Sequence, residues 1–520
     1  MEYIKFRDRL SERYAQYLYA HLKKCAYVVL CTVFATMHGK VYAQNALGCL
    51  ADSVEYKVEG TAVFSDAGGR TPFWLTSNKY GLGGVEHNNG HLRFGVFKDQ
   101  SKDSAKWRMG YGADIAIAHN YTSDFIVQQL YVDLGYKNIL VSAGAKERPA
   151  NLKNAELSSG SQTFGINARP VPEIRFEVPH YISLFGGKKL FSIRAHIGYG
   201  MLTDGNWEET FAKKSASHYA KKALYHSKSG FLKIGNEQIF PVTFEGGLEM
   251  AGTFGGKYYS GTGFSYNMFS GMRDFIDILF GLSSDPGEAV YKNTKGNTLG
   301  SWLLSLDYHG KGWGVRAYYD HFFEDHSGLF YKYMDYDGMY GLEFRLPKNP
   351  IADNVVYEYV YTKYQSGAIY HDETSVIPDK ICGRDNYYNH LIYAGWQHWG
   401  MAIGNPLFLS PIYNKDKQLG FESNRFVAHH VGLCGSPSKD LRYRMLFTFS
   451  QQFGMYARPL DDVKYQRSFL AELTYSPSRL FGRKASGWSA GAAFAFDRGS
   501  YLGNNTGFQI TFSRKGFFSL

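Results

Sequence analysis

Long apolar runs are nearly absent from this chain of 520 residues. Beyond the first 43 residues, no stretch approaches the about 20 consecutive apolar residues that a membrane-spanning helix needs. The mean hydropathy is −0.32, and no Pro-rich or Ser-rich linker divides the chain. The sequence therefore argues against a helical membrane protein and shows no boundary between soluble domains.

Cysteine and catalytic motifs are also scarce. Among the five cysteines, Cys382 and Cys434 are compatible with a disulfide and also with two separate buried thiols. The chain has no Gly-x-Ser-x-Gly elbow, no P-loop and no His-Glu-x-x-His sequence. Since each of these motifs serves a particular reaction, we predict a protein that is not an enzyme and uses no cofactor.

Aromatic residues and glycine, by contrast, are abundant: there are 41 Tyr, 38 Phe and 57 Gly. A two-residue alternation runs through the chain, and it is clearest at 191–200, 302–309 and 340–346. One face of each segment is apolar and aromatic, whereas the other mixes glycine with charged residues. Period two indicates extended strands. This combination is typical of a closed barrel whose outer surface meets lipid and whose lumen is wet.

With about 25 residues for each strand and its connection, we predict an all-β fold, a transmembrane antiparallel β-barrel of about 16–18 strands. A short helix or loops are expected to plug the lumen. The segments 204–236 and 364–390 have the composition of long loops. Residues 269–280 have helical spacing, which predicts a plugging or gating helix or, alternatively, an ordinary loop helix.

The N-terminus has the features of an export signal. Basic residues precede the apolar segment Ala26–Met37, and Val41-Tyr42-Ala43 forms a small-x-small cleavage site. We therefore predict a signal peptide at 1–43 and a barrel at 44–520. Attachment of lipid at Cys49 is an alternative, although the residues before it are a poor lipobox.

Several motifs occur in an order known from one protein family. They are Thr71–Gly81, Gly383–His390, Tyr393–Trp396, Gly404–Leu407, Ser410-Pro411, Asn424-Arg425 and His429-His430. In this order the chain resembles the capsule-assembly Wzi family of Bacteroidetes, over most of its length and most specifically at 383–430. The resemblance implies an outer-membrane barrel of a Gram-negative bacterium that acts as a lectin and helps to attach capsular polysaccharide to the cell.

Polysaccharide binding requires aromatic faces for sugar rings and polar groups for hydroxyls or carboxylates. Arginine suits acidic sugars because its guanidinium forms paired hydrogen bonds with a carboxylate. The candidate binding residues in the 383–430 block are Arg384, Asn386, Tyr387, Tyr388, His390, Trp396, Trp399 and Arg425. The alternative for each is a structural place in the barrel wall or membrane girdle.

Metal and nucleic-acid sites are not predicted. His429 and His430 are adjacent in an expected strand, so their side chains should point to opposite faces and cannot share one ion. The basic residues form no stripe of the kind that binds nucleic acid. The expected partners are capsular or other acidic polysaccharide and outer-membrane lipid, and we expect a monomer.

Two other functions compete with the lectin hypothesis. A porin or small-solute channel would use lumen arginines such as Arg194, Arg316 and Arg345 to pass anions, unless acids such as Asp307 and Glu343 close the pore with salt bridges. An outer-membrane enzyme that modifies glycan or lipid is the second alternative.

Overall fold

The computed structural model describes residues 53–66, 69–102, 106–186, 189–268, 271–280, 296–324, 336–371, 375–376, 381–480 and 483–518. The predicted signal peptide, 1–43, and the alternative lipid site at Cys49 lie outside the described residues.

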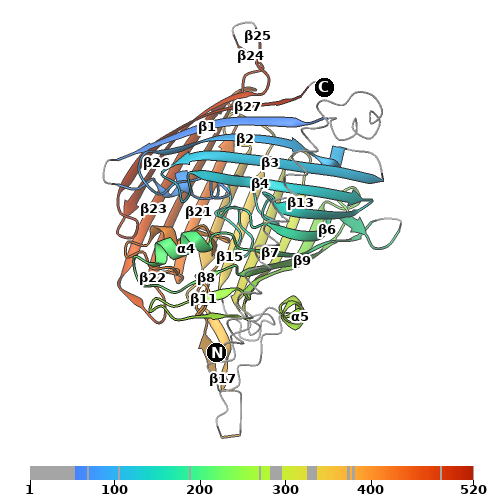
Figure 1. Ribbon diagram of the computed structural model, residues 1–520. Coiled ribbons are helices and arrows are strands. Elements are labelled where there is room, and N and C mark those ends of the chain that lie inside the picture. Colours follow the sequence, from blue (N-terminus) through green and yellow to red (C-terminus); the bar gives the residue numbers. More distant parts are fainter. Residues whose placement is uncertain are drawn as a thin grey trace, which may run out of the picture. The chain divides into compact units, whose positions relative to one another are not determined.

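Eighteen antiparallel strands form one sheet, which closes because β1 pairs with both β2 and β27 (Figure 1). In ring order the strands are β1 (Glu55–Ser65), β2 (Asn89–Lys98), β3 (Trp107–His119), β4 (Phe125–Tyr136), β5 (Ile139–Ala145), β6 (Glu173–Ser183), β7 (Phe191–Met201), β9 (Leu224–Ile234), β10 (Val242–Phe254), β13 (Asn297–His309), β14 (Gly314–Glu324), β15 (Gly338–Arg345), β16 (Asn354–Tyr361), β21 (Phe426–Gly435), β22 (Leu441–Gly454), β23 (Pro459–Tyr475), β26 (Trp488–Gly499) and β27 (Asn505–Phe517). The predicted barrel is confirmed, with the upper of the two strand numbers.

The alternation in sequence is the alternation between the two faces of the wall. In β2, Leu92 and Phe94 are 55% and 44% exposed on the outside, whereas Arg93 between them is 7% exposed and faces the lumen. Arg93 donates to Asp114 of β3 at 3.0 Å. An apolar exterior around a charged interior is the arrangement of a barrel whose outer surface contacts lipid.

Several lumen-facing charges of opposite sign are paired. Asp307 accepts from Arg316 at 2.9 Å and from Arg345 at 2.7 Å, and Arg444 lies 2.5 Å from Glu472. Acidic neighbours on the wall therefore neutralise Arg316, Arg345 and Arg444, whereas Arg194 donates to the neutral Asn151 at 2.5 Å.

The two ends of the barrel differ in their connections. At the end that holds the start of β1 and the end of β27, the turns are short, and β4 joins β5 through Lys137-Asn138 alone. At the opposite end the connections are long, up to residues 362–425 between β16 and β21. We call these the terminal end and the loop end. In Figure 1, β24 (Arg479–Leu480) and β25 (Arg483–Lys484) mark the terminal end, and β17 (Ser366–His371) marks the loop end.

The remaining elements are short. They are α3 (Phe73–Thr76), η1 (Gln100–Lys102), α4 (Gly205–Ala212), α5 (Met272–Phe280), η3 (Pro411–Tyr413), a small sheet of β8 (Tyr219–Lys221), β11 (Lys257–Tyr259) and β12 (Ser265–Asn267), and the pairs of β17 with β18 (Ile381–Arg384) and β19 (Gln397–His398) with β20 (Met401–Ala402). None of the helices in the described part of the chain has the length and apolar character needed to cross a bilayer.

Three loop-end connections fold back inside the barrel and form a plug, which we define as residues 72–88, 146–172 and 385–425. Acidic side chains of the wall anchor its backbone. Glu358 of β16 accepts from the Ser159 N–H at 2.7 Å, and Asp497 of β26 accepts from the Phe73 N–H at 2.9 Å. Because each buried carboxylate satisfies a buried N–H that would otherwise lack a partner, these bonds hold the plug against the wall. The prediction that loops plug the lumen is confirmed.

The predicted loop at 204–236 is wrong in its second half, because β9 begins at Leu224. Its outward positions include His226 and Lys228, which pair across the sheet with Tyr199 and Ile197 on the outer face of β7. Polar residues on an outward face do not suggest a membrane strand. They are tolerated here because α5 covers them.

Helix α5 forms within the predicted 269–280 segment but lies on the outer wall, so it neither plugs nor gates the lumen. Its Phe275 carbonyl accepts from the Tyr199 hydroxyl at 2.8 Å, and its Leu279 carbonyl accepts from Lys228. Ile278 packs so closely on Gly252 of β10 that a Cβ there would lie 2.8 Å from it. The apolar side of the helix matches the apolar exterior, which explains its position.

Candidate functional site

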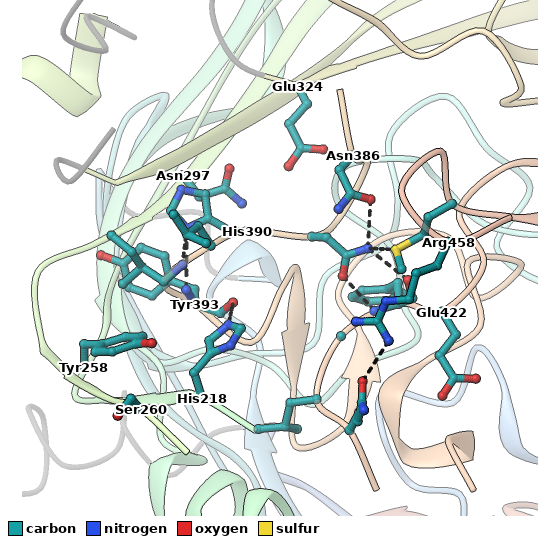
Figure 2. Close-up of a pocket in the computed structure, with 18 of the residues that line it drawn as sticks. His218, Tyr258, Ser260, Asn297, Glu324, Asn386, His390, Tyr393, Glu422 and Arg458 are labelled. Carbon is teal, nitrogen blue, oxygen red and sulfur yellow. Dashed lines mark hydrogen bonds between the residues drawn. The ribbon is translucent and has the colours of Figure 1, made fainter. Parts of the chain in front are cut away.

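A pocket of about 970 Å³ opens at the loop end, where four connections meet. Its walls come from the β7–β9 connection with His218, the β10–β13 connection with Tyr258 and Tyr266, the plug segment 385–425, and the β22–β23 turn with Arg458. Figure 2 shows His218 and Tyr258 on one side of the pocket and Arg458 and Glu422 on the other.

The first side of the pocket is aromatic. The rings of Tyr258 and Tyr266 lie 5.0 Å apart between centroids, and Phe264 lies 5.7 Å from Tyr266. The His218 ring stacks on Tyr258 at 5.9 Å with 26° between the planes. β11 and β12 hold the two tyrosines opposite each other in a two-stranded register. Flat rings fixed in this way offer the apolar surface that the face of a sugar ring requires.

The second side is polar and is built from amides. Asn389 donates to the Phe421 carbonyl at 2.9 Å and accepts from the Phe421 N–H at 2.8 Å. Asn386 accepts from Asn389 at 3.1 Å and from Asn424 at 2.6 Å. Arg458 donates to Gln418 at 3.1 Å. These bonds fix the orientation of the amides, so the polar side is organised before any ligand arrives.

The two histidines of the pocket are uncharged at neutral pH. Burial lowers the pKa of His390 to about 4, and repulsion from His218 adds to the shift. Burial also lowers the pKa of His218, and it raises the pKa of Glu422 on the opposite side. The His390 Nδ1 accepts from the Ile392 N–H at 3.1 Å, which only a ring without a proton on this nitrogen can do.

Three of the residues predicted to bind sugar line this pocket: Arg384, Asn386 and His390. Arg425 is not in the lining, but its guanidinium lies 3.8 Å from the centroid of Tyr456, and Arg384 lies 5.4 Å from the same ring. Tyr456 thus brings the two predicted arginines together at the rim.

Three predicted aromatic residues lie in the plug instead of on a binding surface. Tyr387, Tyr388 and Trp396 are at most 1% exposed, so in this structure they present no face to a sugar. Tyr388 stacks on Phe408 at 4.0 Å between centroids. Trp399 lies elsewhere, beside Arg169, whose guanidinium is 4.5 Å from its ring.

The two adjacent histidines point to opposite faces, as predicted. His430 faces the lumen and its Nε2 lies 2.8 Å from the Leu157 carbonyl, whereas His429 contacts Tyr357 at 2.8 Å on the exposed side. Cys434 is a free, buried thiol, so it forms no disulfide with Cys382, whose side chain lies outside the described residues.

Sequence reasoning missed Tyr258, Tyr266, His218 and Arg458. The available signal was the run Tyr258–Tyr266, in which aromatic residues flank a Ser-Gly-Thr-Gly stretch. Such a run is too short to distinguish a strand of a loop-end sheet from an irregular turn.

No protein-family model matches the sequence, and no curated protein matches it. Among solved structures the chain is similar to Wzi of Escherichia coli, an outer-membrane carbohydrate-binding β-barrel involved in group 1 capsule assembly. The identity is 12% and the TM-score 0.53, over 93% of this chain and 90% of that one.

Two proteins of Pseudomonas aeruginosa are also similar. For OprD the identity is 9% and the TM-score 0.44, over 89% of this chain and 94% of that one. For OpdK the values are 8% and 0.45, over 89% and 98%. At such identities the likeness shows the fold alone. The chain is thus a large β-barrel like the outer-membrane proteins of Gram-negative bacteria.

Proposed function

We propose that this protein resides in the outer membrane with its loop end outside the cell and binds capsular polysaccharide there. Barrels of this kind keep short turns on the periplasmic side and long loops on the extracellular side. The pocket of about 970 Å³, with stacked rings facing oriented amides, is the observation that carries the proposal. It matches what a sugar presents, namely apolar ring faces bordered by hydroxyl groups.

In this proposal the protein binds the polysaccharide without converting it. A capsule polymer repeats its unit many times, so modest contacts with each unit give lasting retention through multivalency. Arg384 and Arg425, held over Tyr456, are the groups we assign to the carboxylates of acidic sugars. The likeness in fold to the carbohydrate-binding Wzi of Escherichia coli supports the same ligand class.

The proposal is tested with purified protein in detergent and capsular polysaccharide from the same host, by biolayer interferometry. We expect Tyr258→Ala and Tyr266→Ala to weaken binding about tenfold each, the loss expected for a stacking contact of roughly 1–2 kcal/mol. Tyr465→Ala, which removes an exposed ring on β23, is the matched control. Equal binding by all three variants would refute the pocket as the site.

A small-solute channel is the second candidate, favoured by the charged lumen wall. The plug and the ion pairs of Asp307 oppose it. In a planar bilayer we expect no large, steady current from the intact protein, whereas a porin would give one.

A further inference from the structure

A second, smaller cavity of about 100 Å³ lies deeper in the barrel. It is a partly open cavity that lies between the plug, mainly its segment 146–172 with Tyr80 and Ile403 from the other two segments, and the lumen faces of β6, β7 and β9. None of its lining residues belongs to the loop-end pocket. This cavity is therefore a site distinct from the proposed sugar site.

The lining of this cavity is strongly basic. It contains the four cations Lys146, Arg148, Arg169 and Arg175 but a single acid, Glu173. Glu173 is shared, because one of its oxygens lies 3.3 Å from Arg148 and 3.4 Å from Arg175.

Neighbours outside the cavity compensate only part of the positive charge. Asp133 lies 2.5 Å from Lys146, and Glu177 lies 2.8 Å from Arg175. Arg169 donates to the Thr122 hydroxyl at 2.6 Å and stacks on Trp399 at 4.5 Å, and both of these partners are neutral. The carboxylate of Asp204 also attracts Arg169, but it accepts its hydrogen bonds from Gln397 at 3.0 Å and from the Trp399 N–H at 2.8 Å. Among the described residues no carboxylate forms an ion pair with the buried Arg169 guanidinium, which favours an anion beside it.

Three residues that line this cavity carry donors without a partner. The buried atoms Arg148 Nη2, Arg169 Nε and His196 Nε2 have no hydrogen-bond partner among the described residues. His196 is 7% exposed and Arg169 is 6% exposed. The other nitrogen of His196, Nδ1, lies 2.6 Å from the Ser229 hydroxyl. When that hydroxyl donates, His196 carries its proton on Nε2 and presents an N–H to the cavity.

We propose that this cavity binds a small oxyanion, a carboxylate or phosphate group, which bridges the plug and the barrel wall. Arg148 and Arg169 supply N–H donors from the plug, and His196 of β7 supplies one from the wall. These three residues line one cavity and each has a buried donor without a partner among the described residues, so an oxyanion held there would supply the missing acceptors. The group belongs either to a free anion or to the acidic end of a glycan chain, and both present the same oxygens.

Isothermal titration calorimetry of the full-length protein in detergent, at constant ionic strength, tests the proposal. Sodium phosphate, sodium acetate and a glucuronate-terminated oligosaccharide are titrated separately. We expect saturable binding of phosphate or acetate and a rise in the melting temperature, since a ligand of the native state stabilises it. If only the oligosaccharide binds, and Arg148→Gln weakens that binding whereas Tyr258→Ala does not, the group comes from a glycan. Oligosaccharide binding that only Tyr258→Ala weakens belongs to the loop-end pocket and counts against the proposal.

Arg148→Gln and His196→Phe each remove one donor and should weaken binding about tenfold, as expected for a charge-assisted hydrogen bond. Arg467→Gln is the matched control, since Arg467 is exposed on β23 and stacks only distantly on Phe449, at 6.0 Å. Circular dichroism confirms that each variant keeps the barrel. Two further results would overturn the proposal: the intact protein binds none of the three probes, which means a cavity filled by water alone, or all variants bind equally.

Discussion

The indole N–H of Trp396 donates to the Thr163 carbonyl at 2.9 Å and so joins two parts of the plug that are 233 residues apart in sequence. The hydroxyl of Tyr388 makes the same kind of bond to the neighbouring carbonyl of Gln162. Both rings are fully buried, so water does not compete for these bonds. The plug is therefore one packed unit. A substitution that disrupts this joint, formed by the two bonds, should loosen the plug and open the lumen.

A methyl group added at Gly404 should break the joint. A Cβ at this position would lie 2.0 Å from the Tyr388 hydroxyl and 2.2 Å from the Gln162 carbonyl oxygen. We expect Gly404→Ala to cost about 1–3 kcal/mol, the usual penalty of overpacking, and to raise bilayer conductance. Gly230→Ala is the matched control, because a Cβ there meets nothing within 4 Å. Equal currents from the two variants would contradict this account of the plug.

The charge of Glu358 should hold the plug to the wall. Its carboxylate accepts from the Ser158 hydroxyl at 2.5 Å, the Ser159 N–H at 2.7 Å and the Tyr318 hydroxyl at 2.5 Å. Glu358→Gln turns one acceptor into a donor that faces other donors. We predict a loss of about 1.5–3 kcal/mol, measured as faster proteolysis of residues 146–172.

The control for this change is Glu237→Gln. The Glu237 side chain is 57% exposed and lies 3.4 Å from His309, so loss of its charge should leave proteolysis unchanged. An equally small effect of Glu358→Gln would show that the wall carboxylates do not anchor the plug.

The loop-end pocket should lose stability in mild acid, because His390 is buried uncharged. The pKa of His390 is about 4 in the folded protein and about 6.5 in an unfolded chain. Between these values the unfolded state binds more protons. Stability is thus complete above about pH 6.5 and falls as the pH drops toward about 4, by roughly 3 kcal/mol in total.

Hydrogen exchange of the amides at 390–393, corrected for intrinsic rates, measures this effect at pH 7 and pH 5. His390→Asn keeps an acceptor for the Ile392 N–H but does not titrate, so its exchange should change less. The same pH dependence in both proteins would assign the effect to other groups, with His218 the first candidate.

Lys228 should hold α5 against the outer wall. Its ammonium donates to the Leu279 carbonyl, one of the orphan carbonyls at the end of the helix. Lys228→Met keeps the apolar length of the side chain and removes the donor. We predict a loss of about 1 kcal/mol in local stability, seen as faster exchange at 272–280 with no change elsewhere in the barrel. Unchanged exchange would mean that apolar packing alone retains the helix.

The sequence predicts the barrel well because each wall strand carries both faces in its own residues, as Leu92, Arg93 and Phe94 do. The sequence predicts strand β9 and the position of α5 poorly. Lys228 faces outward from β9 and is accommodated there by α5, which lies more than forty residues away in the chain. The burial of aromatic residues in the 383–430 block is equally hard to predict from sequence. A ring packed inside a plug and a ring that lines an open pocket are alike in sequence, and only burial separates Trp396 from Tyr258.

Retention of capsule on living cells tests the central claim most directly. In an encapsulated host, the gene is deleted and cell-bound and released polysaccharide are measured. The deletion is then complemented with the intact gene or with Tyr258→Ala/Tyr266→Ala, at equal amounts in the outer membrane. We predict that deletion moves polysaccharide into the medium, that the intact gene restores attachment and that the double variant does not. Unchanged attachment after deletion, or full restoration by the double variant, would contradict the account.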